Sequence, residues 1–170
     1  LLRDDYETRA PERIIFRLRE DNKALAAIST GLANIATAGR VISKYFVDKG
    51  AYRILYLCDN NDYLKQAEEQ LSGLFIENQI EVARMYDGLN QESDSKKSIT
   101  FTSLQNLSKS IEWKKRFIQK YFELVIVDRA HLAVAPSFIS TLQYFVDRDV
   151  PMFGMTTIPT VEIPKELTTL

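Results

Sequence analysis

The stretch YFELVIVDRAHLAV, residues 121–134, carries the strongest structural signal in this sequence. It places the run LVIV, residues 124–127, directly before Asp128, Arg129, Ala130 and His131. A strand that is apolar at every position, instead of at alternate positions, needs helices on both of its faces, as in a parallel sheet. The stretch therefore predicts a buried strand that delivers an acidic residue to the carboxyl edge of a parallel sheet.

The rest of the chain continues this alternation of short apolar runs and amphipathic segments. Strands are expected at 23–29, 53–58, 80–86, 98–103, 123–128 and 151–156. Helical spacing of apolar residues occurs at 7–20, 35–48, 61–77, about 109–120 and about 137–147, with Asn60 or Asn61 as N-cap of the third helix. We expect one domain over residues 1–170, a three-layer α/β/α sandwich around a mainly parallel sheet.

The composition limits the classes of function. The 22 basic and 23 acidic residues give a net charge of −1, so nucleic-acid binding would depend on a local patch. Cys58 is the only cysteine and is expected to be a buried thiol. No apolar run approaches the about 18 residues of a membrane span, and no signal-peptide pattern occurs. We expect a cytoplasmic protein without a membrane partner, and the abrupt ends suggest a piece of something longer.

The segment STGLANIAT, residues 29–37, follows the first expected strand. A loop of small residues that opens a helix can bind phosphate through backbone N–H groups. A working phosphate loop also needs a Lys for the outer phosphates and a Ser or Thr hydroxyl for Mg²⁺. Asn34 and Ile35 occupy those two positions. The loop thus has the backbone plan of a phosphate site without its charged and metal-binding side chains.

Six short segments occur in a familiar order. They are LRDDYETRA (2–10), STGLANI (29–35), LYLCDNNDYLKQA (55–67), FTSLQNL (101–107), VDRAH (127–131) and GMTTIPT (154–160). Together they resemble the motifs of the first RecA-like domain of a superfamily 2 helicase or translocase, of the DEAD/DEAH-like type found in restriction-enzyme motor subunits. The resemblance covers nearly the whole chain. A complete motor of this family also uses a second RecA-like domain, which these residues do not include.

The resemblance implies an ATP and Mg²⁺ site with replaced residues. The nucleotide loop corresponds to Thr30, Gly31, Ala33, Asn34 and Ile35, and Glu7 stands where the family has its adenine-reading Gln. Asp128 is the remaining metal position, Arg129 replaces the catalytic Glu, and His131 is retained. Because the Lys, the hydroxyl and the base are all replaced, we expect no ATP hydrolysis and no tight binding of ATP or Mg²⁺.

Arg129 and His131 each leave two interpretations. Arg129 could bind an anion weakly, or pair with Asp128, Glu7 or another nearby acid and fill the vacated site. His131 couples the nucleotide site to the last motif in the family. With Ile158 in place of the usual hydroxyl, we expect that link to be broken and His131 to be a structural residue with a local hydrogen bond.

The resemblance also implies a weak contact with a DNA or RNA backbone. The positions that match are Asn60, which replaces an Arg, and Thr102, Ser103, Gln105 and Lys109. Residues 112–120, EWKKRFIQK, add Lys114, Lys115, Arg116 and Lys120 beside Trp113 and Phe117. This run is either a patch for phosphates or the solvated face of an amphipathic helix.

Two functions therefore remain open. One is a helicase-type domain that has lost hydrolysis, and the other is a silent RecA-like scaffold for other subunits, a second RecA-like domain or weak nucleic-acid binding. A phosphate at the amides of Gly31 to Asn34 would favour the first. A salt bridge from Arg129 across a closed loop would favour the second.

Overall fold

The computed structural model describes residues 3–28, 31–49, 52–109, 111–117 and 121–157. Its strands are β1 (Lys23–Ala27), β2 (Tyr52–Cys58), β3 (Glu81–Met85), β4 (Lys97–Ser103), β5 (Leu124–Val127) and β6 (Met152–Thr156). Its helices are α1 (Arg3–Asp21), α2 (Gly31–Lys49), α3 (Asn61–Glu77), α4 (Leu104–Ser108), α5 (Glu112–Arg116) and α6 (Pro136–Val146), with a 3₁₀ turn, η1 (Ala130–Leu132), after β5.

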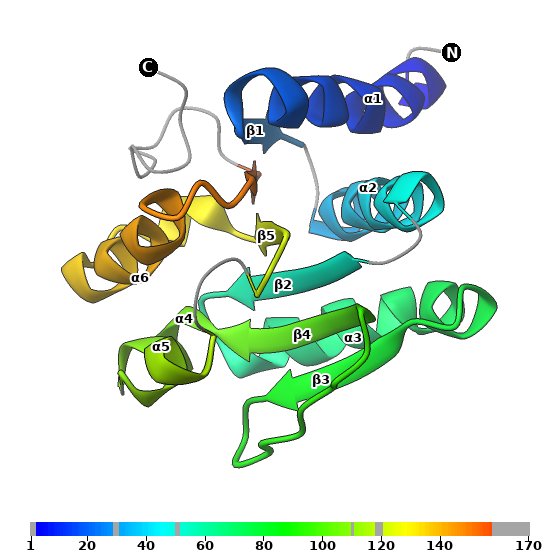
Figure 1. The fold of residues 1–170 in the computed structure, drawn as a ribbon. Coiled ribbons are helices and arrows are strands. Elements are labelled where there is room, and N and C mark those ends of the chain that lie inside the picture. Colours follow the sequence, from blue (N-terminus) through cyan, green and yellow to red (C-terminus); the bar gives the residue numbers. More distant parts are fainter. Residues whose placement is uncertain (1–2, 29–30, 50–51, 110, 118–120, 158–170) are drawn as a thin grey trace.

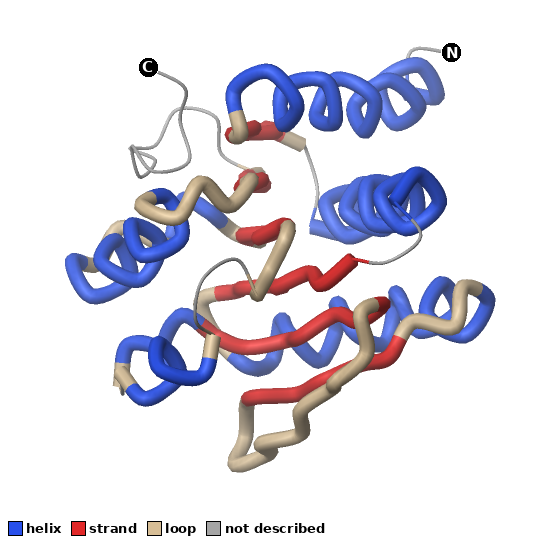
Figure 2. The backbone as a smooth tube through the Cα atoms, viewed as in Figure 1, coloured by secondary structure: helices blue, strands red, loops and turns tan. Residues whose placement is uncertain are grey.

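The strands form one six-stranded sheet in the order β1-β6-β5-β2-β4-β3. Every pairing between these strands is parallel. Figure 1 shows β1 beside α1 at one edge of the sheet and β3 at the other, and Figure 2 shows helices on both sides of the strands. The predicted three-layer α/β/α sandwich is confirmed, and the sheet is more regular than expected because it is parallel throughout.

Alternate residues of the strands face two separate cores. On β2, Ile54 and Tyr56 pack with α1, α2 and α3, whereas Leu55 and Leu57 pack with α4, α5 and α6. All four side chains are buried. Both faces of the strand are therefore covered, which explains why its sequence does not alternate between apolar and polar residues.

The start of α3 agrees with the sequence. The Asn60 side chain accepts hydrogen bonds from the backbone N–H groups of Asp62 and Tyr63, and so caps the helix. The buried residues of α3, Leu64, Ala67, Leu71 and Phe75, follow the predicted apolar face. Cys58 is fully buried, so the expectation of a buried thiol is confirmed, and this burial raises the pKa of the thiol.

The helix predicted over about 109–120 is shorter in the described residues. The structure has two short helices instead, α4 from Leu104 and α5 from Glu112. Ser103 caps α4 by accepting a hydrogen bond from the Asn106 backbone N–H. Trp113 and Phe117 are buried in the second core, and the Trp113 indole N–H donates to the Leu107 carbonyl at 2.8 Å. Burying these two large side chains takes precedence over extending one amphipathic helix.

Helix α2 begins at Gly31, earlier than the predicted start at residue 35. Asn34 and Ile35 therefore lie in its first turn and not in a preceding loop. Among the helices of the described ranges, none has the length and apolar character that crossing a bilayer would require.

Candidate functional site

The carboxyl ends of β6, β5 and β2 meet at one edge because these neighbouring strands are parallel. β2 leads to Asp59, β5 leads to Asp128, and β6 ends at Thr156. The first turn of α2 lies beside this edge, since Asn34 is close enough to Asp128 to affect its pKa. The edge therefore gathers four of the six motif segments.

Asp128 is 5% exposed, and both of its carboxylate oxygens accept hydrogen bonds from this chain. Oδ2 accepts from the hydroxyl of Tyr56 at 2.9 Å, and Oδ1 accepts from the backbone N–H of Arg129 at 2.8 Å. Burial raises the pKa of Asp128, and the hydrogen bonds from Tyr56 and Arg129 partly offset this rise. The carboxylate of Asp128 is thus held by the Tyr56 side chain of β2 and by the backbone N–H of the next residue, Arg129.

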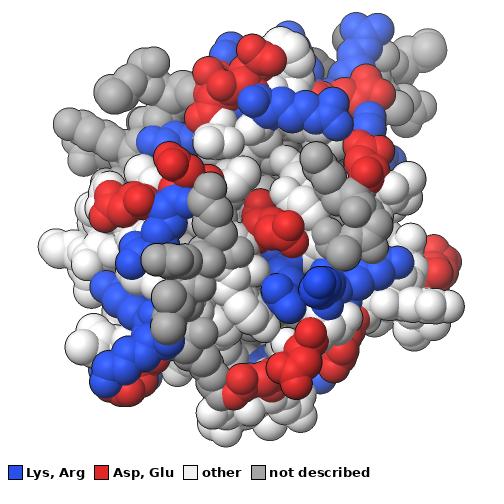
Figure 3. All heavy atoms as spheres, viewed as in Figure 1, with Lys and Arg blue, Asp and Glu red and all other residues white. Residues whose placement is uncertain are grey.

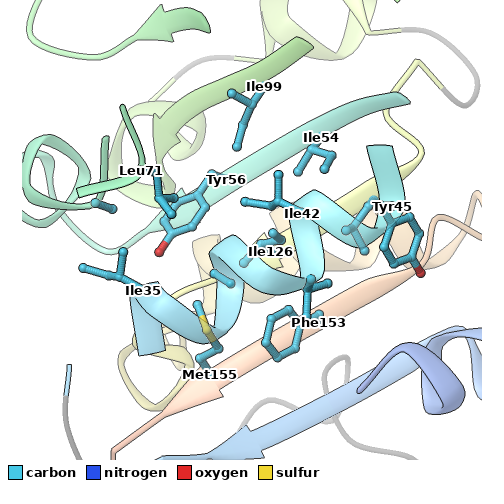
Figure 4. Packing of buried hydrophobic residues seen from close by; sticks show 14 of the residues in the cluster. Ile35, Ile42, Tyr45, Ile54, Tyr56, Leu71, Ile99, Ile126, Phe153 and Met155 are labelled. Atoms are coloured by element: carbon cyan, nitrogen blue, oxygen red, sulfur yellow. The ribbon is translucent and has the colours of Figure 1, made fainter. Parts of the chain in front are cut away.

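Asn34 and Ile35, the two positions predicted to replace the Lys and the hydroxyl of a phosphate loop, have different surroundings. Asn34 is completely buried, and neither its Nδ2 nor its Oδ1 has a hydrogen-bond partner in the described part of the chain. Its amide lies near enough to Asp128 to lower the pKa of that carboxyl, yet outside hydrogen-bonding geometry. Ile35 belongs to the first core, as Figure 4 shows. Position 35 is therefore a packing residue.

Arg129 turns toward β2 and α3. Its backbone has left-handed dihedrals, φ 54° and ψ 45°. Its NH1 lies 3.4 Å from Oδ1 of Asp59, and its guanidinium carbon lies 3.8 Å from the centroid of the Tyr63 ring. The prediction that Arg129 pairs with a nearby acid is confirmed, and the acid is Asp59. Sequence reasoning missed Tyr63, because nothing in the sequence places the first turn of α3 over the end of β5.

His131 retains a link to the last strand. Its Nδ1 lies 3.0 Å from the hydroxyl oxygen of Thr156, so the expectation of a broken link to that motif is wrong. Thr156 supplies the hydroxyl, whereas Ile158 lies outside the described residues. Burial lowers the pKa of His131, and the nearby charge of Arg129 lowers it further. His131 is thus hydrogen-bonded to the end of β6, and not to a residue near it in the sequence as expected.

Three of the residues predicted to contact nucleic acid use their side chains in hydrogen bonds within this chain. Asn60 caps α3 and also donates from Nδ2 to Asp59, and Ser103 caps α4. Thr102 is fully buried, and its hydroxyl donates to the Met85 carbonyl at 2.7 Å. These side chains shape the loops after β2 and β4 and do not present free polar groups to solvent.

Gln105 and Lys109 are the exposed members of that set. Lys109 borders a hollow of about 620 Å³, whose lining is Met85, Asn90, Asn106, Leu107, Lys109, Glu112, Trp113 and Lys115. Within this lining the Lys115 ammonium lies 3.0 Å from the Glu112 carboxylate. Sequence reasoning did not identify the hollow, because nothing in the sequence places Asn90 beside α4 and α5. The side chains of Arg116 and Lys120 are not among those that the structure describes.

The remaining predicted nucleotide positions are only partly described. Gly31 begins α2 and Ala33 is half-buried, while Thr30 and the side chain of Glu7 lie outside the described set. Within that set, no group of three or more His, Cys, Asp and Glu side chains could hold a metal. Mg²⁺ takes oxygen ligands, and each carboxylate oxygen of Asp128 accepts one hydrogen bond, which leaves it a second lone pair. Asp128 therefore keeps the lone pairs that a metal ligand needs.

Comparison with known proteins gives one family and many similar folds. Residues 2–161 match the family described as the type III restriction enzyme, res subunit. No curated protein matches significantly. Among solved structures, a DNA complex of the nuclease-deleted Type ISP restriction-modification enzyme LlaGI has a TM-score of 0.70 and 15% identity over 92% of this chain and 17% of that chain.

Two further solved structures show the same fold. The SWI2/SNF2 ATPase core of Sulfolobus solfataricus in complex with double-stranded DNA has a TM-score of 0.72 and 16% identity over 91% of this chain and 31% of that chain. The Hef helicase domain of Pyrococcus furiosus has a TM-score of 0.66 and 17% identity over 95% of this chain and 34% of that chain. This chain thus spans about a third or less of each of these structures.

The family match extends over nearly all of the chain, and the parallel six-stranded sheet agrees with the solved helicase cores. The chain therefore belongs to the family of the type III restriction enzyme res subunit, and its fold is that of the first RecA-like domain of a superfamily 2 helicase.

Proposed function

We propose that this chain is a helicase-type domain that contacts nucleic acid weakly and does not hydrolyse ATP. The observation that carries the proposal is the position of Arg129, where the family has its catalytic Glu. A guanidinium remains protonated in proteins and cannot accept a proton from an attacking water. Its ion pair with Asp59 also directs it toward β2 and α3.

The other two replacements support the same conclusion. Phosphoryl transfer depends on cations that stabilise the charge of the transferring group. Asn34 is neutral and buried, and Ile35 packs in the core without a hydroxyl. Loss of one such stabilising group costs on the order of 10²–10³-fold in rate. Losing several together should leave no measurable turnover.

Nucleic-acid binding rests on a small surface. Gln105 and Lys109 are exposed beside the hollow near α5, and two of the similar solved structures are complexes with DNA. The chain has no excess of positive charge, and Figure 3 shows acidic and basic side chains interspersed on one face. Each phosphate that a Lys neutralises makes affinity depend on salt. We therefore expect binding to be weak and to disappear at moderate salt.

The proposal is tested by steady-state phosphate release with Mg²⁺-ATP, in the absence and presence of single- and double-stranded DNA. We expect no turnover above the protein-free background. Calorimetric titration of Mg²⁺-ATP should likewise give no saturable heat. DNA-stimulated hydrolysis that disappears in an Asp128→Ala variant would contradict the proposal, because it would require a working site at Asp128.

A second candidate, a scaffold without any nucleotide or nucleic-acid role, is favoured by the same Arg129–Asp59 pair, which ties the end of β5 to the end of β2. Its partners would be a second RecA-like domain or other subunits. Fluorescence anisotropy at low salt separates the two candidates. Lack of DNA binding at about 50 mM salt, where phosphate contacts are strong, would favour the scaffold.

A further inference from the structure

Strand β3 lies at one edge of the sheet, as Figure 1 shows, and a groove of about 370 Å³ lies between this strand and α3. We infer that this edge and groove bind an extended segment of a partner protein, which adds to the sheet as a further strand and carries both apolar and basic side chains. The lining of the groove includes no residue of the six motif segments. The inference therefore goes beyond the proposed function and does not depend on the loss of ATP hydrolysis.

The backbone of β3 directs hydrogen-bonding groups away from the sheet. The Arg84 N–H donates to the Gln91 carbonyl at 3.1 Å, and the Gln91 N–H donates to the Arg84 carbonyl at 2.9 Å, in an antiparallel bridge. The backbone groups of Arg84 thus face outward. Because alternate residues of a strand direct these groups to the same side, those of Val82 also face outward. Among the described residues, Val82 has no backbone partner on that side, so it offers the donor and acceptor that an added strand uses.

The side chains beside this edge make the groove partly apolar. Phe75, Ile76, Ile80 and Val82 belong to its lining. Phe75 and Ile80 are buried, whereas Ile76 is 79% exposed, so most of the Ile76 side chain is in contact with water. A strand added beside Val82 would direct every second side chain toward the α3 face of the sheet. An apolar side chain at such a position would cover Ile76 and remove apolar surface from water.

The charges at the groove favour a basic partner. Arg84 and Glu68, the charged residues of the lining, already pair with each other, with the Arg84 Nε 2.7 Å from Oε1 of Glu68. Glu69 follows Glu68 on α3, and Glu81 begins β3. Both of these carboxylates are exposed, and neither has an ion pair among the described residues. The negative charge that remains attracts Lys or Arg side chains and repels the phosphates of a nucleic acid.

A second copy of this chain fits the same edge less well. Two β3 edges that paired with each other would bring Glu69 and Glu81 of both copies into one interface, where like charges repel. The free part of the edge is also short, because Gln91 already pairs with Arg84. The pairing of Val82 alone would give a small contact, whereas stable dimers bury much larger areas. The flexible, basic segment of another protein is therefore the occupant that the surface favours.

The main test measures the affinity of the whole chain for a fluorescein-labelled peptide of sequence KVKIKVK, by fluorescence anisotropy. We expect saturable binding, and Ile76→Ser should weaken it about tenfold because the peptide then covers no aliphatic side chain at position 76. Val47→Ser is the matched control, since Val47 is an aliphatic residue of α2 that is 73% exposed. It should leave the affinity unchanged. Lack of saturable binding, or an equal loss in the two variants, would overturn the inference.

The role of charge is tested with the same assay. The peptide EVEIEVE keeps the apolar side chains and reverses the charges, so it should bind much more weakly than KVKIKVK. Glu69→Gln should weaken binding of KVKIKVK about threefold, the size expected for one exposed ion pair. Glu20→Gln, at an exposed carboxylate of α1, should not. Equal affinity for the two peptides, or the same loss in both Gln variants, would show that the peptide is not directed to this groove.

Amide hydrogen exchange measured by nuclear magnetic resonance tests the added strand itself. Saturating KVKIKVK should slow exchange of the Val82 N–H about tenfold, since a hydrogen-bonded amide exchanges only when it opens. Unchanged exchange at Val82 would overturn the inference. Sedimentation velocity of the chain alone tests the second copy, and a dimer that Ile76→Ser dissociates would also overturn it. Failure of the proposed function is a separate result, because it requires ATP turnover, which none of these measurements involves.

Discussion

The guanidinium of Arg129 stacks on the ring of Tyr63, with 3.8 Å between its central carbon and the ring centroid. The same side chain is paired with Asp59. Arg129, which the sequence predicts to stand in place of a catalytic Glu, is therefore bound to α3 and to the end of β2. The backbone of Arg129 has a left-handed conformation that residues other than glycine seldom adopt.

Two substitutions at Arg129 separate its side-chain contacts from its backbone strain. Arg129→Ala should lower the free energy of unfolding by about 1–2 kcal/mol, because it removes a cation–π contact and a half-buried ion pair. Arg129→Gly removes the same contacts but favours positive φ, so it should be about 1 kcal/mol more stable than the Ala variant. Urea unfolding measures both. Equal stability of the Ala and Gly variants would contradict the idea that the positive φ at position 129 strains the backbone.

The pH dependence of stability should reflect the buried Asp128. Because burial raises the pKa of Asp128, folding favours its protonated form. This contribution is complete below the ordinary value of 3.8 and is lost as pH rises through the folded-state pKa. Asp128→Asn removes this dependence. The free energy of unfolding of the variant, minus that of the unaltered chain, should therefore be larger at pH 7 than at pH 4. Asp94→Asn, at an exposed carboxylate, should show a smaller trend. An equal trend in both variants would contradict the burial of Asp128.

The protonation of His131 should make the free energy of unfolding change with pH in the direction opposite to that of Asp128. Burial lowers its pKa, so folding favours the neutral imidazole. Its contribution is complete above the ordinary value of 6.5 and is lost as pH falls through the folded-state pKa. His131→Gln, which stays neutral, should lose less stability between pH 7 and pH 5 than the unaltered chain. Chemical denaturation at a series of pH values tests this, and parallel curves would count against it.

Asn60 should behave as a helix cap and not as a nucleic-acid ligand. Asn60→Ala should lower stability by about 0.5–2 kcal/mol, whereas Asn60→Ser should retain most of it, because Ser also caps helices. Neither change should alter DNA affinity when the protein is folded. Anisotropy measurements at low salt check the second point. A selective loss of DNA binding in both variants would restore Asn60 as a contact residue.

Lys109 is the strongest remaining candidate for a phosphate contact. Lys109→Ala should weaken DNA binding and reduce the slope of log affinity against log salt by about 0.7–0.9, the value for one phosphate contact. Lys96→Ala is the matched control, since this exposed lysine precedes β4 and lies at the opposite end of the strand. An identical slope change in both variants would indicate nonspecific attraction instead of a site near α4.

The sequence predicted the sheet more reliably than the site. Runs such as LVIV in β5 have few alternatives to a buried parallel strand, so strand positions were close to those observed. The break between α4 and α5 was missed, because the burial of Trp113 depends on distant residues of α6. Tyr56 was missed for a different reason. A tyrosine in a fully apolar strand signals a buried hydroxyl, but only the fold shows that its acceptor is Asp128, 72 positions along the chain.

The division of β2 between two cores also determines how the domain unfolds. β2 pairs with β4 on one side and β5 on the other, and it contributes Tyr56 to one core and Leu57 to the other. Neither layer of helices can separate without exposing a face of this strand. We therefore expect a single cooperative transition, in which the calorimetric and van't Hoff enthalpies agree and fluorescence of Trp113, from the second core, follows the same curve as far-ultraviolet circular dichroism.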